Sequence, residues 1–326
     1  MIISKTPYRI SFFGGGSDYP SWYIKNGGKV LSTTINKYLY ITCRKLLPFF
    51  NHKIRIVYSR IENVKSLDKI SHPSVKAVLK YLNINSGLEI HYDGELPARS
   101  GLGSSSAFTV GLLNALYAMN NVRISKKNLS KNAITVEQKI IKENVGSQDQ
   151  IAASFGGLNV INFYKNSTFK VSRVDLSKSR IKELESSIVL VDTGISRLAS
   201  KVAKNFINKM NINQSKIESI NYFADEGINL LKSNKYNLKD FAKILTNSWH
   251  VKKNLTLQIS NSKIDKIFQM GLESGAVGGK LLGAGGGGFL LFIVPQELQK
   301  IFYFQMKNFL CIKIKFDNFG SKIIHI

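Results

Sequence analysis

One stretch of the chain has the composition of a phosphate-binding loop. Pro97 disfavours helix before it, and Gly101 and Gly103 permit tight turns. The serines at 104–106 can cap a helix whose buried face begins at Phe108. A helix start offers unpaired N–H groups and a positive dipole end, and glycines let a polyanion approach the backbone. The stretch predicts a phosphate cradle, although an ordinary loop-to-helix junction shares its minimal Gly-x-Gly-Ser pattern.

Two acidic residues follow the cradle, twelve positions apart. Glu137 lies on a predicted helix over 129–142, and Asp149 follows the break at Gly146. A single Glu on a helix is usually solvated, and a single Asp after Ser is usually a cap. Neither acid alone indicates a site.

The N-terminal segment places a basic and an acidic residue on either side of a glycine turn. Residues 8–13 alternate enough to form a strand that includes Arg9, and the turn at 14–16 leads to Asp18. From composition alone, a surface hairpin in which Asp18 caps a short helix near Pro20 explains this pattern as well.

A third glycine-rich stretch occupies residues 280–292. It contains a formal Gly-x-Gly-x-x-Gly from Gly283 to Gly288. A dinucleotide-binding fingerprint needs a helix directly after the glycines, whereas an apolar strand follows here. A glycine hairpin that permits close backbone approach is the simpler interpretation.

These stretches, in this order, resemble the three motifs of the GHMP kinases. Residues 6–19 resemble the first motif, 97–107 the second and 280–292 the third. The family includes galactokinase, homoserine kinase, mevalonate kinase and phosphomevalonate kinase. The spacing of Glu137 and Asp149 resembles the family's pairing of a magnesium-binding Glu with a catalytic Asp. The resemblance implies phosphoryl transfer from ATP with Mg²⁺, which asks mainly for positioning and charge neutralisation.

The resemblance also implies a role for each residue. Ser105 and Glu137 would hold Mg²⁺. Asp149 would accept or orient the proton of the attacking hydroxyl, and Arg9 would stabilise Asp149 as a carboxylate. The cradle and the third motif would bind ATP through Arg99, Ser100, Gly101, Leu102, Gly103, Ser104, Ser105, Ser106, Gly285 and Gly286.

Within the family, residues 12–19, 96–116, 146–150 and 155–159 look most similar to the sugar-kinase branch that acts on D-glycero-D-manno-heptose 7-phosphate. The resemblance implies phosphorylation of the anomeric C1 hydroxyl, toward a GDP-activated heptose for bacterial surface polysaccharide. A fucokinase-type kinase of an unphosphorylated sugar is the alternative. Galactokinases carry Glu and His where this chain has Gly15 and Gly16, so their sugar contacts cannot be copied. The candidates for binding the sugar or its phosphate are Asp18, Gly15, Gly16, Ser17, Thr193, Gly194, Arg197 and Lys280, and Arg99 is a further candidate for the sugar's phosphate.

The order of elements predicts an α+β chain. Strands over 29–34, 38–44, 52–58 and 88–92 would form a sheet beneath the nucleotide, and helices would dominate residues 198–273. The resemblance implies the GHMP two-domain fold. Residues 1–185 would form an N-terminal ATP-binding domain similar to domain 2 of ribosomal protein S5. Residues 186–326 would form a ferredoxin-like half, completed by edge strands at 312–316 and 322–326.

The charge balance offers a different class of function. Forty-six Lys and Arg residues against 21 Asp and Glu residues give a formal net charge of +25, which could indicate a nucleic-acid partner. The lysines are spread through the chain, with no block of five like charges. We therefore expect small anionic substrates and no nucleic acid, and a non-catalytic basic binding protein remains the alternative class.

The remaining composition is that of a globular protein. The longest apolar run, residues 289–294, is far short of the roughly 20 residues that span a bilayer, and the first residues lack a signal-peptide core. Cys43 and Cys311 make neither a disulfide framework nor a zinc spacing. We expect a cytoplasmic protein without a membrane partner, either a monomer or a homodimer.

Overall fold

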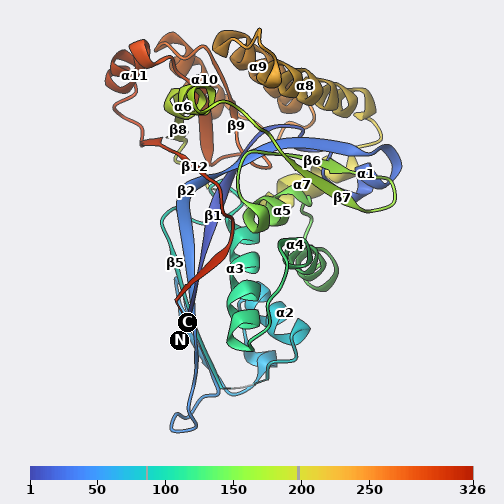
Figure 1. Ribbon diagram of the computed structural model, residues 1–326, viewed down its shortest axis with the longest axis vertical. Helices are drawn as coiled ribbons and strands as arrows, with labels where there is room; N and C mark the ends of the chain where they lie inside the picture. The colour runs from blue at the N-terminus through green and yellow to red at the C-terminus, as the bar shows by residue number, and fades with distance from the viewer. Residues whose placement is uncertain (86, 197–198, 326) are drawn as a thin grey trace.

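The structure is a computed structural model that describes residues 1–85, 87–196 and 199–325. Its strands form two sheets, and Figure 1 shows the larger sheet running down the molecule with the smaller sheet above it. One group of helices lies beside the larger sheet, and a second group covers the smaller one. The N- and C-terminal strands lie side by side in the lower half of the view, where Ile3 is opposite His325.

Among the described residues, the larger sheet gathers nine strands in the order β13-β1-β2-β5-β3-β4, with β6 and β12 paired to β2 and β7 paired to β6. These strands are β1 (Ile2–Phe13), β2 (Gly28–Lys45), β3 (Ile54–Val57), β4 (Ile61–Val64), β5 (Leu88–Gly94), β6 (Asn159–Phe163), β7 (Phe169–Arg173), β12 (Phe316–Asp317) and β13 (Lys322–His325). The antiparallel register of β1 and β2 shifts between Pro7 and Arg9. A bulge twists a strand and re-aims a side chain, and this irregularity adjoins Arg9.

Helix α3 (Ser104–Met119) is the central helix of this part. It is buried along almost its whole length and lies against β1 and β2, which explains the unbroken apolar run after the cradle. The other helices here are α1 (Pro20–Asn26), the 3₁₀ turn η1 (Leu67–Lys69), α2 (Pro73–Tyr81), α4 (Lys126–Ile134) and α5 (Gln148–Phe155). As a result, the cradle serines stand at the start of a helix that the core holds in place.

The predicted helix over 129–142 divides into two elements. Helix α4 ends at Ile134, and a π-helical segment, η2 (Thr135–Ile140), follows it and carries Glu137. π-Helical turns are rare and occur frequently at functional sites. The predicted strands over 29–34 and 38–44 are also joined, because β2 runs through both without interruption.

The smaller sheet has the strand order β11-β8-β10-β9, with every pair antiparallel. Its strands are β8 (Ile188–Asp192), β9 (Gly278–Leu281), β10 (Phe289–Ile293) and β11 (Cys311–Lys313). Its helices are α6 (Lys178–Ser187), α7 (Ala199–Asn208), α8 (Gln214–Lys232), α9 (Leu238–Lys253), α10 (Ser262–Glu273), the 3₁₀ turn η3 (Gln296–Leu298) and α11 (Gln299–Gln305). Strand, helices, two strands, helix and strand is the ferredoxin-like succession, as predicted.

The end of the chain differs from the prediction. Strand β13 pairs with β1, and β12 pairs with β2, so both belong to the larger sheet. The expectation that a strand at 322–326 completes the C-terminal half was wrong, because β11 already fills the free edge beside β8. The boundary at residue 185 remains a prediction, and Ile326 lies outside the described residues.

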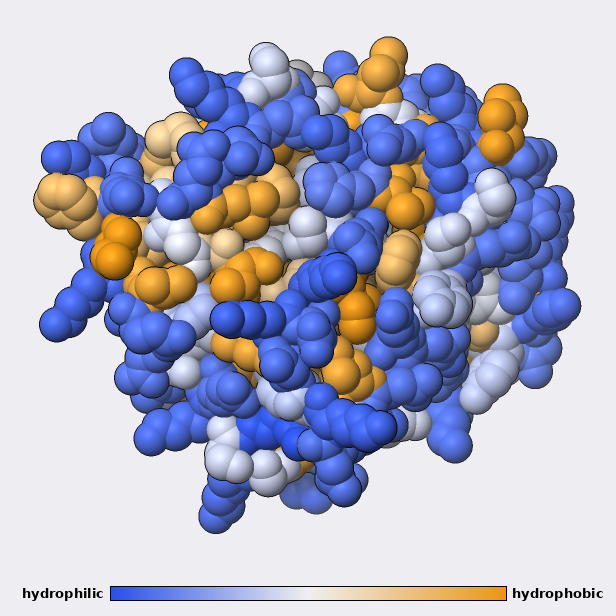
Figure 2. Space-filling view, turned by 90° about the horizontal axis from the view of Figure 1, so that it is seen from above, coloured by the Kyte–Doolittle hydropathy of each residue, from blue (hydrophilic) through white to orange (hydrophobic). Residues whose placement is uncertain are grey.

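On the face seen from above, hydrophilic side chains are widely distributed rather than gathered in one place (Figure 2). Figure 2, which looks onto the upper helices, shows them across most of that face with hydrophobic side chains between them. In the described part of the chain, every helix is too short or too polar to cross a bilayer.

Candidate active site

The cradle turns sharply into α3. Gly103 has a φ of +76° and precedes the first helical residue, Ser104. A Cβ added at Gly103 would lie 3.2 Å from Arg9 Cγ and 3.4 Å from Asp149 Oδ2. Glycine here therefore serves two needs, a left-handed backbone and a close approach to the acid–base pair.

Arg9 and Asp149 form that pair. Arg9 Nε donates to Asp149 Oδ1 at 2.7 Å and Nη2 donates to Oδ2 at 2.8 Å, while Nη1 donates to the Gly101 carbonyl at 2.7 Å. The Arg9 side chain is 5% exposed and the Asp149 side chain 25% exposed, so the carboxylate faces the pocket. One planar guanidinium thus fixes both the carboxylate and the cradle backbone.

Asp18 is buried in the turn after β1. Its Oδ1 accepts from Gly16 N at 2.9 Å and its Oδ2 from Gln148 N at 3.4 Å. Burial raises the pKa of Asp18, and the negative charge of Asp149 adds to the increase. A Cβ on Gly146 would lie 1.9 Å from Asp18 Oδ2, so the helix break predicted at Gly146 also makes room for this carboxyl group.

Glu137 lies behind the cradle, fully buried. Its Oε2 accepts from Ser106 Oγ at 2.8 Å and from the Gln150 side chain. Its Oε1 has no hydrogen-bond partner, and burial raises the pKa of Glu137 to about 7. A buried carboxylate oxygen without a partner is costly, and a cation would satisfy it.

The cradle serines and Glu137 offer oxygen ligands of the kind that a divalent cation prefers, with Glu137 buried behind the pocket lining. Ser105 is exposed and lines the pocket, whereas its neighbour Ser106 is buried against Glu137. Within the described residues, no three His, Cys, Asp or Glu side chains cluster as a metal cage. Mg²⁺ commonly uses one or two carboxylates together with substrate phosphates and water, so one buried Glu beside a phosphate cradle meets its needs.

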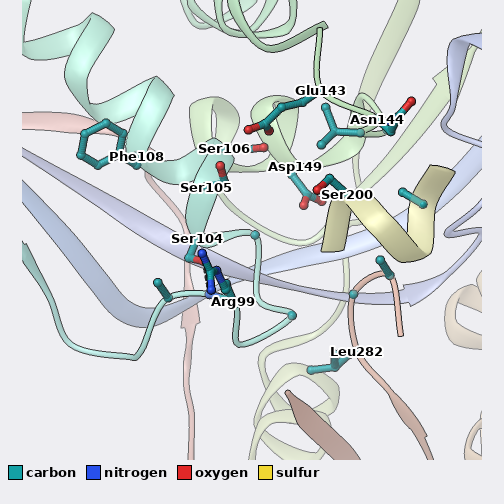
Figure 3. A pocket seen from close by; sticks show the side chains of 18 of the residues that line it. Arg99, Ser104, Ser105, Ser106, Phe108, Glu143, Asn144, Asp149, Ser200 and Leu282 are labelled. Atoms are coloured by element: carbon teal, nitrogen blue, oxygen red, sulfur yellow. Dashed lines mark hydrogen bonds between the residues drawn. The ribbon is translucent and has the colours of Figure 1, made fainter. Parts of the chain in front are cut away.

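These elements surround one pocket of about 810 Å³. Figure 3 shows its wall formed by Arg99 and Ser104–Ser106 of the cradle, the loop with Glu143 and Asn144, Asp149 of α5, Ser200 of α7 and Leu282. The third motif closes on the cradle, because Phe289 N donates to the Ser100 carbonyl at 3.1 Å. The pocket therefore lies where both halves of the chain meet.

One end of the pocket is aromatic. Tyr58, His72, Tyr92 and Phe108 line it, and the rings of His72 and Phe108 are stacked with centroids 4.8 Å apart. The sequence did not reveal this group, because its members come from four separate segments. A flat, half-buried aromatic wall suits a heterocyclic ring.

Two protein-family models match the chain. Residues 70–157 match the GHMP kinases N terminal domain and residues 231–310 match the GHMP kinases C terminal model, about half of the chain together. The chain belongs to the GHMP kinase family. GHMP kinases use ATP as phosphate donor, so the chain is an ATP-dependent kinase, and the cradle and Arg9–Asp149 pair lie in a GHMP kinase two-domain fold.

Several sugar kinases are among the relatives of this GHMP kinase. D-glycero-alpha-D-manno-heptose 7-phosphate kinase of Campylobacter jejuni is 29% identical over 303 residues, covering 90% of this chain and 89% of the relative. The bifunctional fucokinase/GDP-fucose pyrophosphorylase of Arabidopsis thaliana is 27% identical over 318 residues, covering 90% of this chain but 30% of the relative.

Solved structures of sugar kinases share the fold of this chain. A crystal structure described as a "D-glycero-D-manno-heptose 1-phosphate kinase from Bacteriodes thetaiotaomicron" has a TM-score of 0.79 and 26% identity, covering 100% of this chain and 99% of that one. Lactococcus lactis galactokinase complexed with galactose has a TM-score of 0.74 at 18% identity, covering 100% of this chain and 95% of that one, which shows the shared fold alone.

Most residues predicted for this GHMP kinase site lie on the pocket wall. The structure places these there: Arg9, Gly15, Gly16, Asp18, Arg99, Gly101, Gly103, Ser104, Ser105, Ser106, Asp149 and Gly285. Three predicted ATP contacts lie behind the wall instead. Ser100 and Leu102 are buried, and Gly286 N donates to the Ile259 carbonyl at 2.8 Å. Ser100 and Leu102 support the cradle, and Gly286 supports the third motif, from the side away from the pocket.

Four of the predicted sugar-side contacts lie outside the pocket lining. Lys280 is buried in β9, its amine donates to the Phe12 carbonyl at 2.7 Å, and it does not reach the pocket. Thr193 donates to the Gly288 carbonyl at 2.7 Å, and Ser17 donates to the Gly14 carbonyl at 2.9 Å. Gly194 is exposed outside the lining. Arg197 lies outside the described residues.

Lys252 is a pocket cation that the sequence did not reveal. It belongs to the last turn of α9 and lines the pocket, where its Nζ donates to the Gly283 carbonyl at 2.9 Å. Lysines near a helix C-terminus are common, so the sequence around residue 252 gave no signal.

Proposed function

We propose that this kinase transfers the terminal phosphate of ATP to the anomeric C1 hydroxyl of D-glycero-D-manno-heptose 7-phosphate, giving a 1,7-bisphosphate for the synthesis of a GDP-activated heptose of surface polysaccharide. The observation that supports this most is the similarity to the Campylobacter jejuni heptose 7-phosphate kinase over 90% of the chain. So long a match spans both halves that form the pocket.

The Arg9–Asp149 pair would carry out the proton transfer. The hydroxyl oxygen of the sugar would attack the terminal phosphorus, and the bond between that phosphorus and the bridging oxygen of ADP would break. Asp149 would accept the hydroxyl proton, held in position by its two hydrogen bonds from Arg9. Arg9 would also offset negative charge that develops beside Gly101, because Nη1 already contacts this loop.

The cradle would hold the ATP phosphates. Residues 101–103 lead into α3, which begins at Ser104, so backbone N–H groups at the positive end of the helix dipole would face the phosphate oxygens. We propose that Ser105 and Glu137 hold Mg²⁺, which would neutralise phosphate charge when bound. Ser106 and Gln150 would keep the Glu137 carboxylate oriented through its Oε2.

The aromatic end of the pocket would receive the adenine. His72 and Phe108 stack there, and Tyr58 and Tyr92 line the same end. Asp18 would accept hydrogen bonds from sugar hydroxyls on the side of Asp149 that lies away from the adenine. Gly15 and Gly16 leave that part of the wall without side chains.

A second candidate is a fucokinase-type kinase of an unphosphorylated sugar. The Arabidopsis thaliana relative, a fucokinase fused to a pyrophosphorylase, matches 90% of this chain, so its kinase part shares the same extent. The two heptose kinases that the chain resembles are named for different phosphates: one is called a 7-phosphate kinase and the other a 1-phosphate kinase.

ADP release from ATP and Mg²⁺ distinguishes these acceptors. The assay would compare D-glycero-D-manno-heptose 7-phosphate, D-glycero-D-manno-heptose 1-phosphate, fucose, galactose, mannose and no acceptor. We expect fast turnover with the 7-phosphate alone. Preference for fucose or the heptose 1-phosphate would replace the proposed acceptor. If none of the sugars increased ADP release above the control without acceptor, the sugar-kinase proposal would be contradicted.

A further inference from the structure

The space beside Gly15 collects three polar side chains from three elements. A Cβ built on Gly15 would lie 3.4 Å from Lys252 Nζ, 3.5 Å from Gln148 Nε2 and 3.7 Å from Ser11 Oγ. Lys252 comes from α9, Gln148 from α5 and Ser11 from β1. Any larger residue at position 15 would occupy this space, so Gly15 keeps the cluster open.

The polar atoms of this cluster have unused hydrogen-bonding capacity. Lys252 Nζ has three donors but makes one hydrogen bond within the described part of the chain, to the Gly283 carbonyl. Among the residues that the structure describes, none brings a carboxylate oxygen within 4.0 Å of it. Gln148 Oε1 and Ser11 Oγ are buried without a partner. Unpaired buried groups of this kind are costly unless a ligand satisfies them.

Charged groups from β1, the turn after it, α5 and β9 act on the Lys252 ammonium. Asp18 has the strongest influence and Asp149 a weaker one, and both favour the protonated form of Lys252, whereas Arg9 opposes it. Lys280 of β9 carries a further amine on this side. Burial outweighs the acids and lowers the pKa of Lys252 to about 8. The lysine is therefore mostly charged at neutral pH and loses its charge in mildly alkaline solution.

We propose that Lys252, with Gln148 and Ser11, binds the acceptor through oxygen atoms next to the reacting hydroxyl. The inference depends on the proposed function, since it assigns the acceptor side of the same pocket. Adjacent sugar hydroxyls both donate and accept, so one can accept from Lys252 or Gln148 Nε2 while donating to Asp18 or Ser11 Oγ. Where galactokinases place side chains at positions 15 and 16, this chain uses a cation from its C-terminal half.

Substitution of Lys252 tests this assignment. Lys252→Met keeps an unbranched side chain one atom shorter and removes the charge, and Lys252→Arg keeps the charge. Lys253→Met is a matched control on the same turn, where the native lysine pairs with Asp265 at 2.8 Å. We expect Lys252→Met to raise the acceptor KM about 10- to 100-fold with the ATP KM unchanged within about twofold. Lys252→Arg should recover part of the loss, and Lys253→Met should resemble the wild type.

The pH profile of the acceptor kcat/KM is a second measurement. It would not change if Lys252 had only a structural role. In the wild type, kcat/KM for the acceptor should fall as the pH rises through about 8, because Lys252 loses its proton there. Lys252→Met should lack this limb, and Lys252→Arg should move it to higher pH. Thermal melting and the ATP KM show whether each variant is folded.

The outcomes separate this inference from the proposed function. A wild-type enzyme that prefers another sugar would overturn the heptose assignment, and the Lys252 series would then be measured with that sugar. An active wild type and a Lys252→Met variant with unchanged acceptor KM would overturn the inference alone. A fall in kcat with both KM values unchanged would also overturn it, because Lys252 would then act on the transferred phosphate.

Discussion

The donor side and the acceptor side of the pocket are built differently. On the donor side the polar side chains hold one another, because Arg9 clamps Asp149 and Ser106 holds Glu137. On the acceptor side, Lys252 has donors to spare and nearby buried polar atoms have no partner. The Arg9–Asp149 pair is positioned before any ligand arrives and Glu137 keeps only its Oε1 for a cation, whereas Lys252 and Ser11 keep most of their hydrogen-bonding capacity for the ligand.

This difference assigns different kinetic consequences to the two sides. Changes on the donor side should reduce transfer to every acceptor, since they disturb groups common to all phosphoryl transfers. Changes on the acceptor side should alter the acceptor KM and selectivity while leaving ATP binding intact.

The largest effect is expected for Asp149→Asn. The amide cannot accept the hydroxyl proton and loses the charge that Arg9 faces, so kcat should fall about 10³-fold. ATP affinity, measured by calorimetry, should remain close to that of the wild type. Asp175→Asn, at an exposed position, is the control. Turnover within a few-fold of the wild type would remove Asp149 from the mechanism.

Arg9→Lys should have the next largest effect. A lysine keeps the charge but cannot make the paired contacts to Asp149 together with the contact to the Gly101 carbonyl. We expect kcat to fall about 10²-fold for all acceptors alike, in steady-state assays beside the surface control Arg173→Lys. A loss confined to one acceptor would place Arg9 on the acceptor side.

Glu137→Gln tests the metal position. Without the buried carboxylate, the Mg²⁺ concentration for half-maximal rate should rise about 10- to 100-fold. Nucleotide binding in the presence of a chelator should change little, and the exposed control Glu226→Gln should leave both quantities unchanged. An unaltered Mg²⁺ requirement would contradict the assignment.

The smallest effects are expected at the two neighbouring glycines of the acceptor side. Gly16 has a φ of +122° and would place a Cβ 3.3 Å from Phe206, so Gly16→Ala should lower stability by about 1 kcal/mol in urea unfolding. Gly15 carries no such strain and approaches Lys252, so Gly15→Ala should keep stability and raise the acceptor KM a few-fold. The reverse pattern would contradict the subsite beside Gly15.

The same comparison explains what the sequence could predict. The cradle, Arg9, Asp18 and Asp149 belong to short contiguous motifs with restrictive glycine positions, and the structure brings them together on one pocket wall. Lys252 is one lysine among many on a helix, and only the packing of α9 against the third motif gives it a place. Lys280 was a plausible phosphate contact until the fold buried its amine against Phe12.

Long-range pairing limited the prediction of the fold in the same way. The ferredoxin-like succession could be inferred from local patterns, but the pairing of β13 with β1 joins residues more than 300 positions apart. No local pattern in residues 322–325 specifies which sheet they join. The π-helical turn at Glu137 was also missed, since its apolar spacing matches an ordinary helix.

The most direct test of the central claim is an NMR spectrum of the product formed from D-glycero-D-manno-heptose 7-phosphate, ATP and Mg²⁺. We predict a second phosphate whose phosphorus couples to the anomeric proton, formed in equal amount to ADP. A new phosphorus signal coupled to any other sugar proton, or ADP formed without a second sugar phosphate, would contradict transfer to the anomeric hydroxyl.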